Sequence, residues 1–113
     1  MEYSLFINVK EAVFCWIRNY EEKLERENIE IEIVENNIKR LYAIFNWGEC
    51  MAAIVVAEPD FAPYRFVSCE IVAMENGATT MLYSWYDEEY IAIEEIINNL
   101  DKAIDIAFKY NIS

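Results

Sequence analysis

The residue types that usually carry catalysis are scarce in this chain of 113 residues. It contains no histidine, which excludes Ser-His and Cys-His nucleophile pairs and general-base catalysis by an imidazole. Gly48 and Gly77 are its only two glycines, so there is no glycine-rich loop that could hold a phosphate. These absences predict a protein that is not an enzyme and that binds no cofactor.

Carboxylates are the chemical groups that remain. Asp101 and Asp105 share one side of the last predicted helix with Glu94, opposite the apolar stripe of that helix. This placement predicts a solvent-exposed face rather than a catalytic or metal site. Glu70 differs, because it lies among aromatic residues in the middle of a predicted strand, where burial would raise the pKa of its carboxyl group. A single carboxyl of this kind predicts at most a contact to a ligand.

The cysteines and the N-terminus predict a cytoplasmic protein. Cys15, Cys50 and Cys69 are widely spaced, and each lies within an apolar pattern. They are expected to be small buried hydrophobic residues in a reducing compartment, without a metal. The first residues lack the basic segment and cleavage site of a signal peptide, and no apolar run approaches the roughly 20 residues of a membrane span.

A helix is expected at each end of the chain. The first is predicted to begin at Asn8, which forms a capping box with Glu11, and its apolar residues recur at steps of three and four as far as Leu24. The sequence leaves open whether residues 2–7 extend this helix. The second is predicted to begin after Asp87 as its cap, with Glu88 and Glu89 near its N-terminus. Its apolar stripe runs over residues 93–108.

Between the helices, five segments have the pattern of β-strands: residues 29–35, 38–47, 50–57, 65–74 and 79–86. Two-residue turns are expected at Asn36-Asn37, Gly48-Glu49 and Asn76-Gly77, and residues 58–64, which hold both prolines, are expected to form a loop. The sequence therefore predicts a single α+β domain over residues 1–113. Its five-stranded antiparallel sheet is a meander in the order α-β-β-β-β-β-α, flanked by the N- and C-terminal helices.

Counting from these turns gives the strand registers, which pair Ile33 with Arg40, Tyr42 with Val55, and Ile71 with Leu82. In this register one face of the sheet collects four aromatic and three acidic residues: Phe45, Trp47, Tyr83, Trp85, Glu30, Glu32 and Glu70. If both helices cover the opposite face, this set is an exposed binding surface. If each helix covers one face, its aromatic members belong to the core.

The net charge of −12 bears on the choice of partner. So acidic a chain repels nucleic acids and anionic membranes and attracts a basic protein, although acidity also keeps a small apolar domain soluble. We therefore expect a non-catalytic, acidic protein-binding module that engages a basic partner through the seven residues above. Such a module would hold or inhibit its partner, as immunity proteins, antitoxin-like inhibitors and chaperones do.

Two other functions stay open at this stage. The first is a small-molecule-binding domain with a pocket between the sheet and the helices. Its polar contacts would be Ser68, Glu70 and Tyr83, with the loop of residues 58–64 as a gate. The second is a homodimer that uses the aromatic face as its seam.

Overall fold

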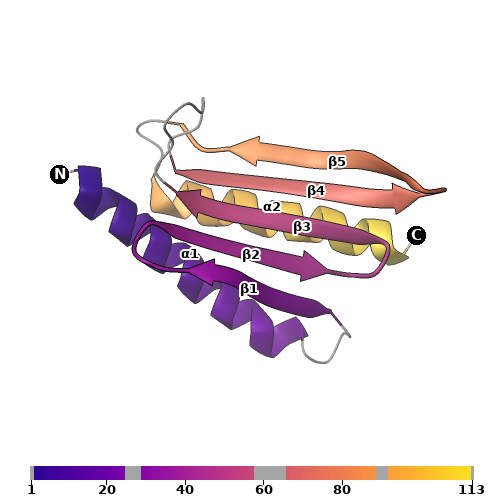
Figure 1. Ribbon diagram of the computed structural model, residues 1–113, viewed down its shortest axis with the longest axis horizontal. Helices are drawn as coiled ribbons and strands as arrows, with labels where there is room; N and C mark the ends of the chain where they lie inside the picture. The colour runs from indigo at the N-terminus through magenta and orange to yellow at the C-terminus, as the bar shows by residue number, and fades with distance from the viewer. Residues whose placement is uncertain (1, 25–28, 58–65, 89–91, 113) are drawn as a thin grey trace.

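The structure, a computed structural model, describes residues 2–24, 29–57, 66–88 and 92–112. Its elements are α1 (Glu2–Leu24), β1 (Glu30–Asn36), β2 (Arg40–Asn46), β3 (Cys50–Ala57), β4 (Val67–Glu75), β5 (Ala78–Tyr86) and α2 (Ile93–Ile112). The strands form one antiparallel sheet in the order β1-β2-β3-β4-β5 (Figure 1). The predicted α+β meander with a helix at each end is confirmed.

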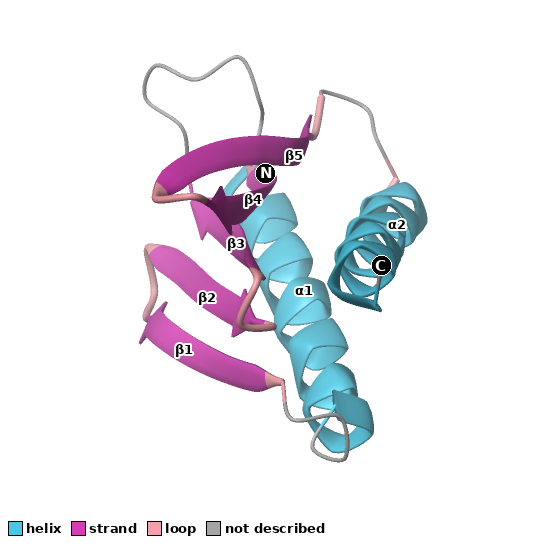
Figure 2. Ribbon diagram, turned by 90° about the vertical axis from the view of Figure 1, so that its right-hand side faces the viewer, coloured by secondary structure: helices cyan, strands magenta, loops and turns pink. Residues whose placement is uncertain are grey.

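Both helices lie on the same face of the sheet (Figure 2). Helix α1 contacts β2 and β3, whereas α2 contacts β3, β4 and β5, and the two helices also contact each other. The fold therefore has two layers, helices on one side and sheet on the other. This is the first of the two arrangements that the sequence left open, and it leaves the second face of the sheet without a covering helix.

The helices begin elsewhere than the sequence predicts. Helix α1 begins at Glu2, so Asn8 is an exposed residue within the helix and not its cap. Helix α2 begins at Ile93, with Glu94 and Glu95 in its first turn, and Asp87 is not its cap either. The buried Asp87 carboxylate instead accepts hydrogen bonds from two backbone amides next to β4. Glu89 lies outside the described residues.

Two of the three predicted turns are confirmed, and they fix the registers beside them. Across the turn at Gly48, Tyr42 pairs with Val55 as expected. Asn76 and Gly77 both have positive φ angles, of 51° and 79°, which suit the two central residues of a tight hairpin. Next to this turn, Ala73 and Thr80 form the predicted pair.

The predicted turn at Asn36-Asn37 is wrong. Residues 37–39 connect β1 to β2, and the side-chain oxygen of Asn37 accepts hydrogen bonds from the backbone amides of Lys39 and Arg40 at 2.8 and 3.0 Å. The register also shifts within β1, where Val34 is an extra residue in a β-bulge. Ile33 consequently pairs with Ala43 and not with Arg40.

A second bulge changes the register between β4 and β5. Leu82 is the extra residue, so Ile71 pairs with Tyr83, and Cys69 pairs with Trp85. The predicted pairs of Ile71 with Leu82 and of Cys69 with Ser84 are therefore wrong. Each bulge moves the residues beyond it to the other face of the sheet.

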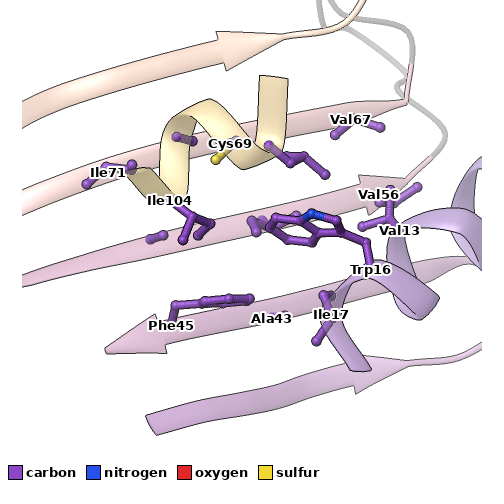
Figure 3. Close-up of a cluster of buried hydrophobic side chains, with 14 of the residues drawn as sticks. Val13, Trp16, Ile17, Ala43, Phe45, Val56, Val67, Cys69, Ile71 and Ile104 are labelled. Carbon is purple, nitrogen blue, oxygen red and sulfur yellow. The ribbon is translucent and has the colours of Figure 1, made fainter. Parts of the chain in front are cut away.

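The core lies between the helices and the sheet (Figure 3). An aromatic row runs through it, with ring centroids 5.7 Å apart for Trp16 and Phe45, 5.9 Å for Phe45 and Trp47, and 5.8 Å for Trp47 and Phe108. Such pairs add roughly 0.5–1.5 kcal/mol each beyond the burial of their area. The row joins both helices to β2.

The cysteines follow the prediction in part. Cys50 and Cys69 are buried as expected, and burial raises the pKa of the Cys69 thiol to about 12, so this thiol is not a reactive group. Cys15 is exposed on α1, contrary to the prediction.

Candidate binding surface

The four aromatic residues predicted to form an exposed surface lie on the helix-covered face. Phe45 is fully buried, and Trp47 is 7% exposed in the aromatic row described above. Tyr83 and Trp85 pair with the buried residues Ile71 and Cys69, and they pack against the core while staying partly exposed. The four aromatic residues therefore share a face as expected, but both helices cover this face and not the opposite one.

The three acidic residues of the predicted surface lie on the other side of the sheet. Glu32 pairs with Ile44, Glu30 pairs with Asn46, and Glu70 pairs with Ala53. Glu30 and Glu32 are exposed, and Glu70 is half-buried. The acidic and aromatic parts of the predicted surface thus point to opposite faces of the sheet.

The uncovered side of the sheet, which we call the open face, has an apolar centre. Because side chains alternate along a strand, the residues that pair with one another between the buried positions all point to this side. Its large apolar members are Tyr42, Ile44, Met51, Val55, Val72 and Met81. Its acidic members are Glu30, Glu32, Glu35 and Glu70.

Methionine is concentrated on the open face. Met51, Met74 and Met81 lie there, three of the four methionines in the chain, and the side chains of Met74 and Met81 are 58% and 51% exposed. Methionine side chains are flexible and polarizable, and they are common on surfaces that adapt to a partner. A surface of this composition is suited to binding another protein.

Some of the acidic residues on the open face lie beside a positive charge, and others do not. Near one end of β2, Arg40 lies 3.6 Å from Glu35 and places its guanidinium 5.2 Å from the ring centre of Tyr42. Among the ion pairs that described residues make with one another, none includes Glu30, Glu32 or Glu70. These carboxylates leave the β1 side and the middle of the open face negative.

A shallow depression of about 420 Å³ lies where the acidic and apolar parts meet, and Glu30, Glu32, Ile44 and Met51 are among its lining residues. Carboxylates surround an apolar floor here. That combination fits the long side chain of a lysine or arginine, which buries its methylene groups while its charge meets the acid.

The residues suggested for a small-molecule pocket do not converge. Ser68 and Glu70 point to the open face, whereas Tyr83 lies on the helix-covered side through its pairing with Ile71. The proposed gate, residues 58–64, is outside the described residues. The described part of the chain therefore does not bring the three predicted polar contacts together.

The apolar residues of the open face were visible in the sequence, but Tyr42, Ile44 and Val55 were placed on the face that both helices were expected to cover. Tyr42, Ile44 and Val55 alternate with Leu41, Ala43 and Phe45, so both sets of side chains are apolar and the pattern alone does not say which is covered. The clustering of methionines was the available signal.

Comparison with known proteins adds no assignment: no protein-family profile, curated protein or solved structure matches this chain. In the described part of the chain, no helix is both long and apolar enough to cross a membrane. Nor do the described residues include a group of three or more histidine, cysteine, aspartate or glutamate side chains placed to hold a metal ion.

Proposed function

We propose that this protein is a non-catalytic, acidic binding module that engages a basic protein partner through the open face. The observation that carries the proposal is the position of both helices on one face of the sheet. It leaves Tyr42, Ile44 and Val55 at the centre of an apolar surface that no described helix covers. A contiguous apolar surface on a sheet face is typical of an interaction site.

The charge supports a basic partner. The chain carries a net charge of −12, and Glu30, Glu32 and Glu70 place part of that charge beside the apolar centre. Complementary charge speeds encounter and selects partners, while desolvation of the apolar centre supplies the affinity. Holding or inhibiting the partner is the activity that such a surface can perform without catalytic groups.

Affinity capture from native lysate tests the proposal. Three baits are compared: the wild-type protein, the open-face variant Ile44→Thr/Val55→Thr, and the control variant Leu5→Thr. Leu5 is an exposed apolar residue on α1, so the control makes the same kind of change on the helix side. Threonine keeps the β-branched shape that suits a strand.

We expect the wild type and Leu5→Thr to retain the same basic protein at low salt, and the open-face variant to lose it. Less of that protein should be retained at moderate salt, because screening weakens exposed charge pairs. Equal retention by all three baits would contradict the proposal. Recovery of each bait alone at twice its own mass would replace the partner with a second copy of the chain.

A further inference from the structure

The two edges of the sheet differ in charge. Edge strand β1 carries Glu30, Glu32 and Glu35, which discourage another strand from pairing with it. The opposite edge strand β5 has the sequence ATTMLYSWY and no charged residue over nine positions. Among the described strands, β4 is its only neighbour. The β5 edge therefore lacks the charges that protect the β1 edge.

The backbone of β5 has groups that point away from β4. In an antiparallel pair the hydrogen-bonded positions alternate, and the amide of Asp87 donates to the carbonyl of Val67 at 3.1 Å. Because every second residue is hydrogen-bonded in this way, the backbone N–H and C=O groups of Trp85 and Tyr83 also point toward β4. Ser84 lies between them, so its N–H and C=O point outward at the edge.

The side chains around Ser84 define what an added strand would meet. On the helix-covered side, Tyr83 and Trp85 flank this position and are only partly buried. On the open face, Ser84 is small and pairs with Glu70 on β4. An added strand would run about 10 Å from Glu70, twice the usual strand spacing of about 4.8 Å. A long basic side chain can close that distance across the serine.

The charges near β5 favour a basic segment of another protein over a second copy of this chain as the strand that pairs with this edge. Residues 66–88 hold four acidic residues, Glu70, Glu75, Asp87 and Glu88, and no lysine or arginine. Two copies paired antiparallel through β5 would bring the Glu75 end of one strand to the Glu88 end of the other, which is repulsive. A basic segment from another protein would instead meet the accessible carboxylates of Glu70 and Glu88 as counter-ions.

We propose that the β5 edge binds an extended basic segment of the partner protein as a sixth strand, with lysine or arginine alternating with apolar residues. The apolar side chains pack beside Tyr83 and Trp85, and the basic ones reach toward Glu70. Backbone pairing at Ser84 supplies the affinity and the alternation supplies the selectivity, as in other strand-addition complexes. This inference rests on the proposed function for the charge of the partner, and adds how that partner is bound.

The test uses a defined probe, the end-capped hexapeptide Lys-Val-Lys-Val-Lys-Val, titrated into the folded protein while backbone amide resonances and their hydrogen exchange are followed by NMR. We expect resonance shifts and slowed exchange at the Ser84 amide, with no change along β1. A Glu-Val hexapeptide and a version of the probe with a central proline should not bind. Glu70→Gln should weaken binding about threefold, the effect of one partly exposed charge pair, whereas the matched change Glu11→Gln, at an exposed position on α1, should leave it unchanged.

Three results would overturn the inference: no binding of the lysine peptide up to millimolar concentration, shifts confined to β2 and β3, or a Ser84 amide already protected in a dimer of the protein alone. If the peptide fails while Ile44→Thr/Val55→Thr still abolishes capture, strand addition is wrong and the open-face proposal stands. If the peptide fails and the open-face variant captures as well as the wild type, both are wrong.

Discussion

Asp87 has the sequence pattern of one structural role and performs another in the folded protein. Followed by two glutamates, it has the sequence pattern of a helix cap. In the structure it is 1% exposed, and its Oδ1 accepts hydrogen bonds from the amides of Phe66 and Val67 at 2.8 and 2.9 Å. The carboxylate thereby takes the place of a backbone acceptor where β4 begins beside the end of β5.

Replacing Asp87 by alanine should lower the free energy of unfolding by about 2–4 kcal/mol, because two buried amides lose their acceptor. Asp87→Asn should cost less, since the amide oxygen can still accept. Urea unfolding measures both values. A loss below about 1 kcal/mol in Asp87→Ala, accompanied by reduced helix content, would instead support the capping role.

Replacing either of the two tryptophans predicted to lie on a binding surface should change the stability of the protein by a different amount. Trp47 stacks on Phe45 and meets the ring edge of Phe108 in the core, whereas Trp85 is only partly buried on edge strand β5. Trp47→Ala should cost about 3–5 kcal/mol of unfolding free energy, and Trp85→Ala about half as much. Similar small losses from both, measured in urea, would contradict the burial of Trp47.

At the scale of elements, the number, type and order of the helices and strands follow from hydrophobic period and turn residues. What the sequence does not predict is the bulge at Val34 and the bulge at Leu82. Neither residue is a glycine or part of a turn signal, and each only adds one position to an apolar run. Yet each bulge reverses the faces beyond it, which brings Ile33 on β1 and Tyr83 on β5 to the helix side.

Tertiary packing supplies the reason for these bulges. The bulge in β1 turns Ile31 and Ile33 toward the core beneath the helices, and the bulge in β5 does the same for Tyr83 and Trp85. The acidic and aromatic residues of the candidate surface were placed on one face for the same reason, because the faces were counted from the turns without bulges. The central pair of strands, β2 and β3, has no bulge, and there the predicted register is confirmed.

The two helices are joined by hydrogen bonds that the sequence analysis missed. Asp101 on α2, predicted to face solvent, accepts hydrogen bonds from the indole N–H of Trp16 at 2.8 Å and from the hydroxyl of Tyr20 at 2.9 Å. Burial, followed by this hydrogen bond to Asp101, raises the pKa of Tyr20 from 10.0 to about 12. The contact therefore has a measurable pH dependence.

The unfolded chain releases the Tyr20 proton near pH 10, before the folded protein does. The contribution of this group to stability is therefore complete below pH 10 and is lost as the pH rises from about 10 to about 12. Asp101→Asn should lower the pKa of Tyr20 by removing the charge, and the matched variant Asp105→Asn should lower it less. Tyrosinate absorbance, taken as the difference from a Tyr20→Phe version of each protein, measures the shift. Equal shifts in the two variants would contradict a specific role for Asp101.

At the scale of the whole molecule, the proposed function rests on the placement of both helices on one face of the sheet. A sheet covered on one face only must either face solvent with polar side chains or meet a partner with apolar ones. The open face presents Ile44, Met51 and Val55 at its centre and acidic residues beside them. Together with the net charge of −12, this arrangement is the basis for our proposal that the partner is a basic protein.

The most direct test of this account is the dissociation constant of the captured basic protein for three purified proteins, measured by calorimetry at one salt concentration. These are the wild type, Ile44→Thr/Val55→Thr and Leu5→Thr, each first shown to be folded by circular dichroism. We predict that the open-face variant binds at least about tenfold more weakly, because central apolar contacts carry most of the binding energy, while Leu5→Thr binds like the wild type. Equal affinities for all three would show that the partner binds elsewhere and would contradict the central claim.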